Sequence, residues 1–523
     1  HGIYEQEDRD ARKTNRGSDD NYQCMIRTKL PGGQLTAAQY LAHDWIASEY
    51  GNDTLRITTR QDFQFHGVLK SDLREAIRSL NDVLITTLGA CGDIVRNVMA
   101  CPAPTADPQR RAVQDFAFQL SNDLFPKTTA YHQIWINGEA LIDDSPVEDP
   151  LYGKTYLPRK FKIAIAFPGD NCVDVYTNDV GLVAVFDEDN RLAGFNLLAG
   201  GGLGTTHNND STFARLADGI AFVDPEQVLE AVRAIVTIHR DYGDRVDRKH
   251  ARLKYILQEW GVERFRDELQ NRVTFALQPL RPMPAFAAPD HLGWNGQGDG
   301  KLYLGIYVEN GRIADRGGAR VRSGLRAIVE RFQPSVRLTA QQNILLVDIN
   351  PQDQPAIEVL MDEYGIRAVE RISRVRRAGL ACPALPTCGL AITEAERFMP
   401  QVLDEFEVTL EELGLGDEEI VVRMTGCPNG CARPYVAEIG LVGRSLNKYT
   451  IFLGGASVGT RLAAPFLDLI RGESIVSTLR PVLALFRETR LPGEPFGDFC
   501  NRVGLDTLRE TVQSIISLAE AGD

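Results

Sequence analysis

Nine cysteines occur in this chain of 523 residues, and four of them are gathered in one stretch, residues 382–431. They form two pairs, Cys382 with Cys388 and Cys427 with Cys431, and each pair is surrounded by proline and glycine. Thiolates are the usual ligands of iron–sulfur clusters, and four of them complete a 4Fe–4S cubane. Proline and glycine favour irregular loops, from which side chains of separate segments can converge. The composition of this stretch therefore favours a cluster site.

Three other uses of these thiols stay open on spacing alone. Two C-x-x-C pairs would indicate zinc, whereas the pairs here have five and three intervening residues. Disulfides are chemically possible, although an odd cysteine count in a large chain favours a reduced, intracellular protein. Packing of inert thiols is the third use, but it would not require so many turn residues. Between the pairs, Thr393 and Glu396 have the spacing of a capping box, which predicts a helix through Phe398.

A second stretch, residues 55–69, alternates between an apolar and a polar face, as expected of a β-strand. The apolar face carries Leu55, Ile57, Phe63 and Phe65. The polar face carries Arg56, Thr58, Arg60, Gln64 and His66. A solvated sheet surface has the same pattern, so the alternation alone does not indicate a ligand. A row of cations and amides would also suit a buried anionic group, because arginine supplies paired donors to carboxylates.

Two lysines lie two residues apart in the segment YLPRKFKIAIAF, which is predicted to form a strand. Lys160 and Lys162 therefore share one face, and Phe161, Ile163 and Ile165 share the other. Adjacent ammonium groups repel each other unless an anion lies between them. On an exposed strand such a pair would be unremarkable, so the spacing is compatible with both a surface and an anion site.

The glycine-rich segment LLAGGGLGTTHNND, residues 197–210, could be taken for a phosphate-binding loop. It lacks the G-x-x-x-x-G-K-[ST] spacing that such loops require. Close approach of the backbone to a flat cofactor explains the glycines equally well.

The overall composition excludes some classes of function. A net charge of −14 argues against a general nucleic-acid-binding protein and against a partner of anionic membranes. No apolar run approaches the length of a membrane span, and the N-terminal segment is charged rather than signal-like. We therefore expect a cytoplasmic enzyme, with a plastid as the alternative location, and with no membrane partner and no nucleic-acid partner.

A weak internal repeat indicates how the chain is organised. Residues 336–344, VRLTAQQNI, resemble residues 55–63, LRITTRQDF, and this alignment places Gln341 at the position of Arg60. Two copies of one strand–helix–strand unit predict an α+β protein with a pseudo-twofold axis and a ligand held between the halves. The length of the chain suggests about three domains.

The motifs CPALPTC and RMTGCPNGCARP together resemble the signature of assimilatory sulfite reductase hemoproteins, in the siroheme and 4Fe–4S sulfite/nitrite reductase family. The segments TTRQDFQFHG, VRNV, LPRKFK and the glycine-rich run occur in the family's order, so the resemblance spans nearly the whole chain. It implies six-electron reduction of sulfite to sulfide, with both cofactors at the domain junction. A siroheme nitrite reductase is the alternative, although such relatives usually carry Ser at the position of Gly430 and lack the Arg433–Pro434 pair.

The resemblance also implies roles for individual residues. All four thiols would bind the cluster, and Cys431 would in addition bridge to the siroheme iron. The residues expected to face sulfite are Arg27, Arg96, Lys160 and Lys162. Those expected to bind siroheme are Arg60, Gln64, His66, Asn97 and Arg159. Non-enzymatic iron–sulfur or zinc-stabilised binding proteins form the remaining class of explanation.

The expected organisation has five segments. These are an N-terminal arm (1–21), the first half of a split ferredoxin-like repeat domain (22–89), a central siroheme-binding domain (90–295), the second half-repeat (296–367) and a C-terminal cluster domain (368–523). Helices are predicted at 463–470, 475–488 and 505–521. Family members usually have further residues before the N-terminal segment, so we expect a native piece to be missing there.

No flavin or nicotinamide fingerprint occurs, so an external electron donor is required, either a ferredoxin or an NADPH-dependent flavoprotein. The segment RISRVRRAG carries the densest basic patch, just before Cys382. Its arginines are expected either to dock an acidic donor or to form a solvated, salt-bridged surface: Arg371, Arg374, Arg376 and Arg377.

Overall fold

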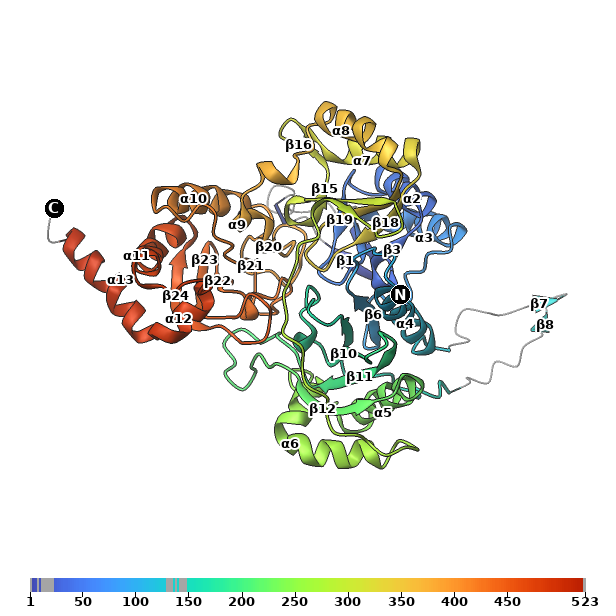
Figure 1. Cartoon of the computed structure of the whole chain (residues 1–523). Coiled ribbons are helices and arrows are strands. Elements are labelled where there is room, and N and C mark those ends of the chain that lie inside the picture. Colours follow the sequence, from blue (N-terminus) through green and yellow to red (C-terminus); the bar gives the residue numbers. More distant parts are fainter. Residues whose placement is uncertain are drawn as a thin grey trace, which may run out of the picture.

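The computed structural model describes residues 2–6, 9–10, 23–127, 135–136, 139–140 and 148–520. Its fold is α+β and contains, in this described part, four five-stranded sheets. Figure 1 shows three lobes: the N-terminal segment interleaved with the yellow segment near residue 330, a green central lobe, and an orange-to-red C-terminal lobe. No helix among the described residues is long and apolar enough to cross a membrane. Most of the expected arm lies outside the described residues.

The two predicted half-repeats form one domain of two exchanged sheets. The first sheet has the order β1-β2-β5-β4-β15, and the second has the order β13-β14-β19-β18-β3. The strands of the first are β1(Ile3–Gln6), β2(Gln23–Arg27), β5(Phe63–Leu69), β4(Leu55–Ile57) and β15(Arg312–Ile313). Those of the second are β13(Gly293–Gly296), β14(Leu302–Ile306), β19(Ile344–Ile349), β18(Ser335–Leu338) and β3(Gln34–Leu35). Each half lends one edge strand to the other, so neither is a complete sheet without its partner.

Two pairs of helices cover these sheets: α2(Ala37–Glu49) and α3(Leu73–Asp82) from the first half, and α7(Val321–Phe332) and α8(Gln354–Glu363) from the second. Helix α2 begins with a capping box, in which the Thr36 side chain accepts from Gln39 N and the Gln39 side chain accepts from Thr36 N. The helices and both sheets contribute to a single hydrophobic core.

The turns of the two halves confirm the repeat that the sequence predicts. Thr58 N donates to Asp62 O at 2.9 Å, and Thr339 N donates to Asn343 O at 2.9 Å. The Asp62 carboxylate then accepts from Leu30 N, and the equivalent Asn343 amide accepts from Val308 N. Each turn contains one glutamine with positive φ, at Gln61 (58°) and Gln342 (67°). The two turns therefore have the same hydrogen bonds and the same backbone conformation.

The central domain is built on the sheet β12-β11-β10-β9-β6. Its strands are β6(Val95–Ala100), β9(Phe161–Ala166), β10(Val180–Phe186), β11(Leu192–Ala199) and β12(Asp218–Val223). The helices α4(Pro108–Asp123), α5(Val228–Tyr242) and α6(Leu253–Gln270) share its core. The residues Trp135–Ile136 and Glu139–Ala140 form a separate small hairpin, β7–β8.

The C-terminal domain contains the sheet β20-β21-β22-β23-β24. Its strands are β20(Leu380–Ala381), β21(Val422–Thr425), β22(Ile439–Ser445), β23(Lys448–Leu453) and β24(Ala464–Arg471). Its helices are α9(Arg374–Arg377), α10(Met399–Glu412), α11(Ile475–Thr489), α12(Phe496–Val503) and α13(Leu505–Glu520). The helix predicted at 463–470 is wrong, because this segment pairs antiparallel with β23 and forms the sheet edge. The helices predicted at 475–488 and 505–521 are present as α11 and α13.

The central and C-terminal sheets repeat one topology. In both, the first three strands run parallel and the last two antiparallel. In both, a short 3-10 turn precedes the third strand, and the residue that caps its N-terminus is left-handed: Asp174 (φ 48°) in one sheet and Arg433 (φ 58°) in the other. These two equivalent residues form an ion pair with each other, Arg433 Nε to Asp174 Oδ2, at 2.8 Å. Equivalent positions of the two domains thus contact each other across the pseudo-twofold axis, and Asp174 pairs with Arg423 of the C-terminal domain as well.

Candidate functional site

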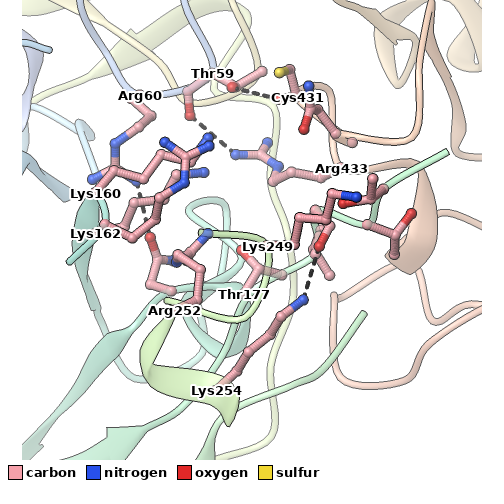
Figure 2. Close-up of a pocket in the computed structure, with 18 of the residues that line it drawn as sticks. Thr59, Arg60, Lys160, Lys162, Thr177, Lys249, Arg252, Lys254, Cys431 and Arg433 are labelled. Carbon is pink, nitrogen blue, oxygen red and sulfur yellow. Dashed lines mark hydrogen bonds between the residues drawn. The ribbon is translucent and has the colours of Figure 1, made fainter. Parts of the chain in front are cut away.

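A cavity opens where the three domains meet, and its lining is strongly basic (Figure 2). It encloses about 1060 Å³ of space not occupied by atoms, its open mouth included. Nine of the lining residues are basic and none is acidic: Arg60, Arg159, Lys160, Lys162, Arg248, Lys249, Arg252, Lys254 and Arg433. Cys431 and Gly430 also line it, as do Leu203 to Thr206 of the glycine-rich segment. A cavity with this charge is suited to a large anionic ligand.

Lys160 directly precedes strand β9 and Lys162 is its second residue, and both side chains extend into this cavity (Figure 2). Within the described part of the chain, neither ammonium group has a hydrogen bond or an ion pair to a protein atom. Burial lowers the pKa of Lys160 to about 8. Burial also lowers the pKa of Lys162, well below its usual value, and the adjacent Lys160 charge adds to this effect. The predicted repulsion between the two ammonium groups is thus present, and no carboxylate among the described residues pairs with either of them.

Arg60 and Arg433 are held by the protein while they line the cavity. The Arg60 guanidinium donates to Asn178 Oδ1 at 3.0 Å and to the Asn97 and Ile163 carbonyls, and burial lowers its pKa to about 9. Arg433 donates to Thr59 O at 3.2 Å and to a carbonyl of the second half-repeat. Both arginines therefore fasten two domains together at the cavity wall.

Sequence reasoning missed the basic group contributed by residues 248–254. Arg252 forms a buried pair with Asp179, Nη2 to Oδ2 at 2.8 Å. Lys254 donates to the carbonyls of Gly202 and Gly204 in the glycine-rich segment, and burial lowers its pKa to about 7. The signal that could have found this group is its density of charge, since RKHARLK contains four Lys or Arg residues in seven.

Four of the predicted site residues are not among those that line the cavity: Arg27, Gln64, Arg96 and Asn97. With the Gln64 amide oriented so that its oxygen faces the guanidinium, it accepts two hydrogen bonds from Arg27, which is its neighbour across β2 and β5. Arg96 donates to the carbonyls of Gly92 and Ala90. Asn97 is fully buried and donates to the Leu30 and Arg60 carbonyls. These residues support the wall of the cavity but are not among the residues that line it.

His66 is placed away from the cavity lining. Its Nδ1 is 2.8 Å from Gln6 Nε2, and burial lowers its pKa well below the usual value, with Arg312 adding to the effect. Arg159, by contrast, lines the cavity, where Asp93 is its carboxylate partner at 3.8 Å. The structure therefore brings Arg159 and Arg60 to the candidate site together with the lysine pair, and leaves His66 outside its wall.

The predicted capping box at Thr393 and Glu396 is wrong. No helix starts there; α10 begins at Met399. The Glu396 side chain instead accepts from Arg312 Nε at 2.8 Å and from Arg56 Nη1 at 3.1 Å, both of the split domain. Thr393 Oγ1 accepts from Asn447 N. A buried interdomain ion-pair network has overridden the local capping tendency.

The four cysteines of the two motifs are brought together beside the cavity. Burial raises the pKa of Cys382 well above its usual value, and the Cys431, Cys427 and Cys388 thiols add to this effect. Burial raises the pKa of Cys427 to about 12, and Cys431 again contributes. Cys431 is the exposed member and reaches the cavity, where Thr59 Oγ1 donates to its carbonyl at 2.9 Å.

These residues fit the two cofactors that the motifs imply. The thiols raise one another's pKa because neighbouring thiolates repel each other, and the positively charged iron of an iron–sulfur cluster would offset that repulsion. The basic lining, with two unpaired ammonium groups, suits the carboxylates of a siroheme macrocycle. Cys431 belongs to both the thiol group and the cavity lining, so it is placed to connect the two sites.

Comparisons with known families agree with this arrangement. The family model described as nitrite and sulphite reductase 4Fe-4S domain matches residues 118–277 and 374–517. The model described as nitrite/sulfite reductase ferredoxin-like half domain matches residues 16–83 and 295–364. The two models thus account for the repeated halves and for the two repeated sheets.

Individual relatives match over nearly the whole chain. The ferredoxin sulfite reductase of Synechococcus elongatus is 46% identical, over 98% of this chain and 85% of the relative. The NADPH sulfite reductase hemoprotein beta-component of Myxococcus xanthus is 45% identical, over 96% and 90%. Among solved structures, the Mycobacterium tuberculosis NirA protein superposes with a TM-score of 0.77 at 26% identity, over 97% of this chain and 90% of that one.

Proposed function

This chain belongs to the nitrite and sulphite reductase family, and we propose that it catalyses the six-electron reduction of sulfite to sulfide. The observation that carries this proposal is the cavity lined by nine basic and no acidic residues, with Cys431 in its wall. Relatives named as sulfite reductases, at 44–46% identity and nearly full length, support sulfite over nitrite as the substrate. Gly430 and Arg433 support the same choice. Arg433 is also fixed in the structure, since it pairs with Asp174 and donates to Thr59 O.

The cofactors of the proposal are siroheme and one 4Fe–4S cluster. When bound, they supply the iron that holds the sulfur oxyanion and the path by which electrons reach it. The cluster ligands would be the four cysteines of the two motifs, Cys382, Cys388, Cys427 and Cys431. The siroheme carboxylates would be held by Arg60, Arg159, Arg252 and Lys254, which line the cavity. Gln64, His66 and Asn97 stay predictions as siroheme contacts, and they are not among the residues that line the cavity.

The chain's own residues would perform two tasks at the substrate. Lys160 and Lys162 would hold the anion, because preorganised cations in a water-poor cavity stabilise negative charge strongly. They would also deliver protons as each oxygen leaves as water. A lysine with a pKa near 8 both stays charged at neutral pH and gives up its proton more readily than an ordinary lysine. Arg27 and Arg96, fixed by the hydrogen bonds described above, would add positive charge behind the pair.

The rest of the proposal concerns organisation and partners. The domain limits are proposed at 22–89 with 296–367, 90–295 and 368–523. An external protein would supply the electrons, and the relatives include both ferredoxin and NADPH forms. We place the enzyme in the cytoplasm, where a reduced cluster and its thiols are maintained.

The experiment that tests the function combines a spectrum with a substrate comparison. The purified protein should show siroheme absorption, bound iron and inorganic sulfide, and its kcat/KM with a small chemical reductant should be higher for sulfite than for nitrite. Absence of siroheme absorption in protein produced in cells that make siroheme would refute the proposal. A higher kcat/KM for nitrite would instead establish the nitrite reductase alternative.

A further inference from the structure

A second group of metal-ligating side chains lies in the central domain, and the proposed function does not use it. It consists of Cys101, Asp170, Cys172 and His291, whose ligand atoms all lie within 4.8 Å of one another. Cys101 Sγ is 2.8 Å from Asp170 Oδ2 and 3.7 Å from His291 Nε2. Asp170 Oδ2 is 3.3 Å from the same ring nitrogen. Cys101, Asp170 and Cys172 are at most 3% exposed, and the His291 side chain is 7% exposed.

Three separate segments bring these side chains together. Cys101 directly follows strand β6, Asp170 and Cys172 lie on the turn after β9, and His291 lies in the segment that leads into β13. The last two segments are hydrogen-bonded to each other, since Asn171 N donates to Ala287 O at 2.7 Å and Ala287 N donates to Gly169 O at 3.1 Å. The backbone thus presents the four ligands before any ion binds.

The position of Cys101 is equivalent to that of Cys382, one of the four cysteines in the two motifs. In the central sheet, Ala100 ends β6 and pairs with Ile165 of the parallel neighbour β9. In the C-terminal sheet, Ala381 ends β20 and pairs with Met424 of its parallel neighbour β21. Each cysteine is the next residue after the alanine that ends the strand. Both sheets therefore place a thiol directly after the end of their first parallel strand.

Cys172 is equivalent in the same way to Cys431. Each lies two residues before the left-handed residue that opens a 3-10 turn, Asp174 in the central domain and Arg433 in the C-terminal domain. The parallel pairing of β9 with β10 has the same register relative to its turn as the pairing of β21 with β22 has relative to its own. The central domain thus keeps two thiols at the positions where the C-terminal domain has two of its four. Asp170 and His291 complete its set with a carboxylate and an imidazole.

We propose that Cys101, Asp170, Cys172 and His291 bind one Zn²⁺ ion through two sulfur, one nitrogen and one oxygen ligand. In a tetrahedral zinc site, bond lengths of about 2.0–2.3 Å place neighbouring ligand atoms about 3.5 Å apart, close to the spacings found here. Such spacing suits one ion rather than a cubane, in which each thiolate binds a different iron. Thiolate and imidazole ligands select zinc over magnesium or calcium.

The surrounding charge suits this ion. Two thiolates and one carboxylate around Zn²⁺ leave one net negative charge, and the site is buried. Arg110 Nη1 lies 3.0 Å from both Cys101 Sγ and Asp170 Oδ2, so its positive charge balances the site from outside the ligand set. The guanidinium is itself positioned over the Phe167 ring, at 4.3 Å.

With four protein ligands the site is closed, so its role is structural rather than catalytic. It would fasten the turn of residues 169–174 to the end of β6 and to the segment before β13. Asp174 of this turn binds both Arg423 and Arg433, at 2.7 and 2.8 Å. The ion would therefore fix the turn through which the central domain contacts the C-terminal domain at the cavity wall.

The test is a metal analysis of the purified holoenzyme, with Zn²⁺ alone as the added probe. We expect one zinc per chain in addition to the iron of the cofactors. X-ray absorption at the zinc edge should show two sulfur neighbours at about 2.3 Å and two nitrogen or oxygen neighbours at about 2.0–2.1 Å. Little zinc after incubation with Zn²⁺ would overturn the proposal, and so would four sulfur neighbours, which would place the metal at the other cysteines.

Two single variants separate this site from the cluster site. Cys172→Ser and His291→Ala should each lose the zinc while iron and inorganic sulfide stay at the wild-type ratio. The matched control is Cys24→Ser, a buried thiol outside both groups, which should keep one zinc. Zinc that remains in both Cys172→Ser and His291→Ala would overturn the assignment. If a variant is unstable, the zinc content and the X-ray absorption spectrum of the wild-type protein still test the proposal.

Discussion

At the scale of single residues, Lys160 and Lys162 show what spacing can and cannot establish. The alternation in the sequence places them on one face of a strand, and in the structure Lys162 of β9 and Lys160, which directly precedes β9, both line the cavity. Whether that face is exposed depends on residues 248–254 and on the turn that contains Arg60, which are distant in sequence. Local periodicity has no information about those contacts. The resemblance to a family, rather than the strand pattern, predicted that this pair faces an anion.

Replacing either lysine by alanine should lower the sulfite turnover number by a factor of about 10²–10³, the usual effect of removing a positioned donor at a catalytic anion. Siroheme absorption should stay at the wild-type level, because other cations hold the macrocycle. Arg252→Ala should show the opposite pattern, with reduced siroheme content. The control is Lys154→Ala, an exposed lysine that precedes the strand. Wild-type kinetics in both lysine variants would remove the pair from the site.

The lowered pKa of Lys160 predicts a pH dependence. Its protonated form holds the anion and donates protons, so kcat/KM for sulfite should fall as the pH rises past about 8. Bound carboxylates of siroheme would move this limb upward, because negative charge favours the protonated lysine. Lys160→Arg should shift the falling limb to higher pH, whatever its effect on kcat. Since sulfite itself titrates, variant and wild type are compared at each pH; identical profiles would contradict the assignment.

At the scale of elements, the sequence predicted the regular repeats better than the contacts between them. The predicted single strand over residues 55–69 is wrong, because a turn at residues 58–62 divides it into the antiparallel strands β4 and β5. The alignment of residues 55–63 with 336–344 did correctly indicate two copies of one unit, since both copies contain this turn. The capping box at Thr393 and Glu396 failed because its carboxylate is used by two arginines of another domain. The predicted helix at 463–470 failed because an edge strand is defined by its neighbour β23. Both errors arise from partners that are distant in sequence.

The Glu396 network predicts a stability effect. Glu396→Gln would leave Arg56 and Arg312 buried without a full counter-charge, and breaking a buried pair typically costs on the order of 3–5 kcal/mol. We expect a clearly lower Tm and faster loss of iron on warming. The matched control is Glu394→Gln, whose pair with Arg397 is more exposed and should contribute about 0–1 kcal/mol. Equal Tm values for the two variants would show that the network does not hold the domains together.

At the scale of the whole molecule, the cavity combines residues from every domain. A net charge of −14 gave no indication of a basic cavity, because a global sum does not describe where charges lie. The order of the family motifs along the chain correctly indicated the parts that meet there. The basic residues 248–254 were not identified, since they lie beside a helix start with no motif of their own. What the sequence could not supply was the packing of one domain against another.

The basic patch expected to dock an electron donor is smaller than the sequence indicated. Arg376 is buried and binds Glu309, Asp404 and Glu407, so it is not available to a partner. Arg371 and Arg374 are exposed. Arg374 begins the short helix α9, which leads through β20 to Cys382. Arg377 is half-buried and pairs with Asp290 at 3.5 Å, so Arg371 and Arg374 are the exposed arginines that remain in the patch, near the chain segment that carries Cys382.

If this patch guides an acidic ferredoxin, the double variant Arg371→Glu and Arg374→Glu should raise the KM for ferredoxin several-fold at low ionic strength. The increase should shrink as salt is added, because long-range steering between exposed charges is screened within about 10 Å at 0.1 M salt. Turnover with a small chemical reductant should be unchanged, since neither residue lines the basic cavity. Arg78→Glu, an equally exposed arginine on α3, is the charge-matched control. An unchanged KM for ferredoxin would place the docking surface elsewhere, and an equal loss with both reductants would show that these arginines support the cluster instead.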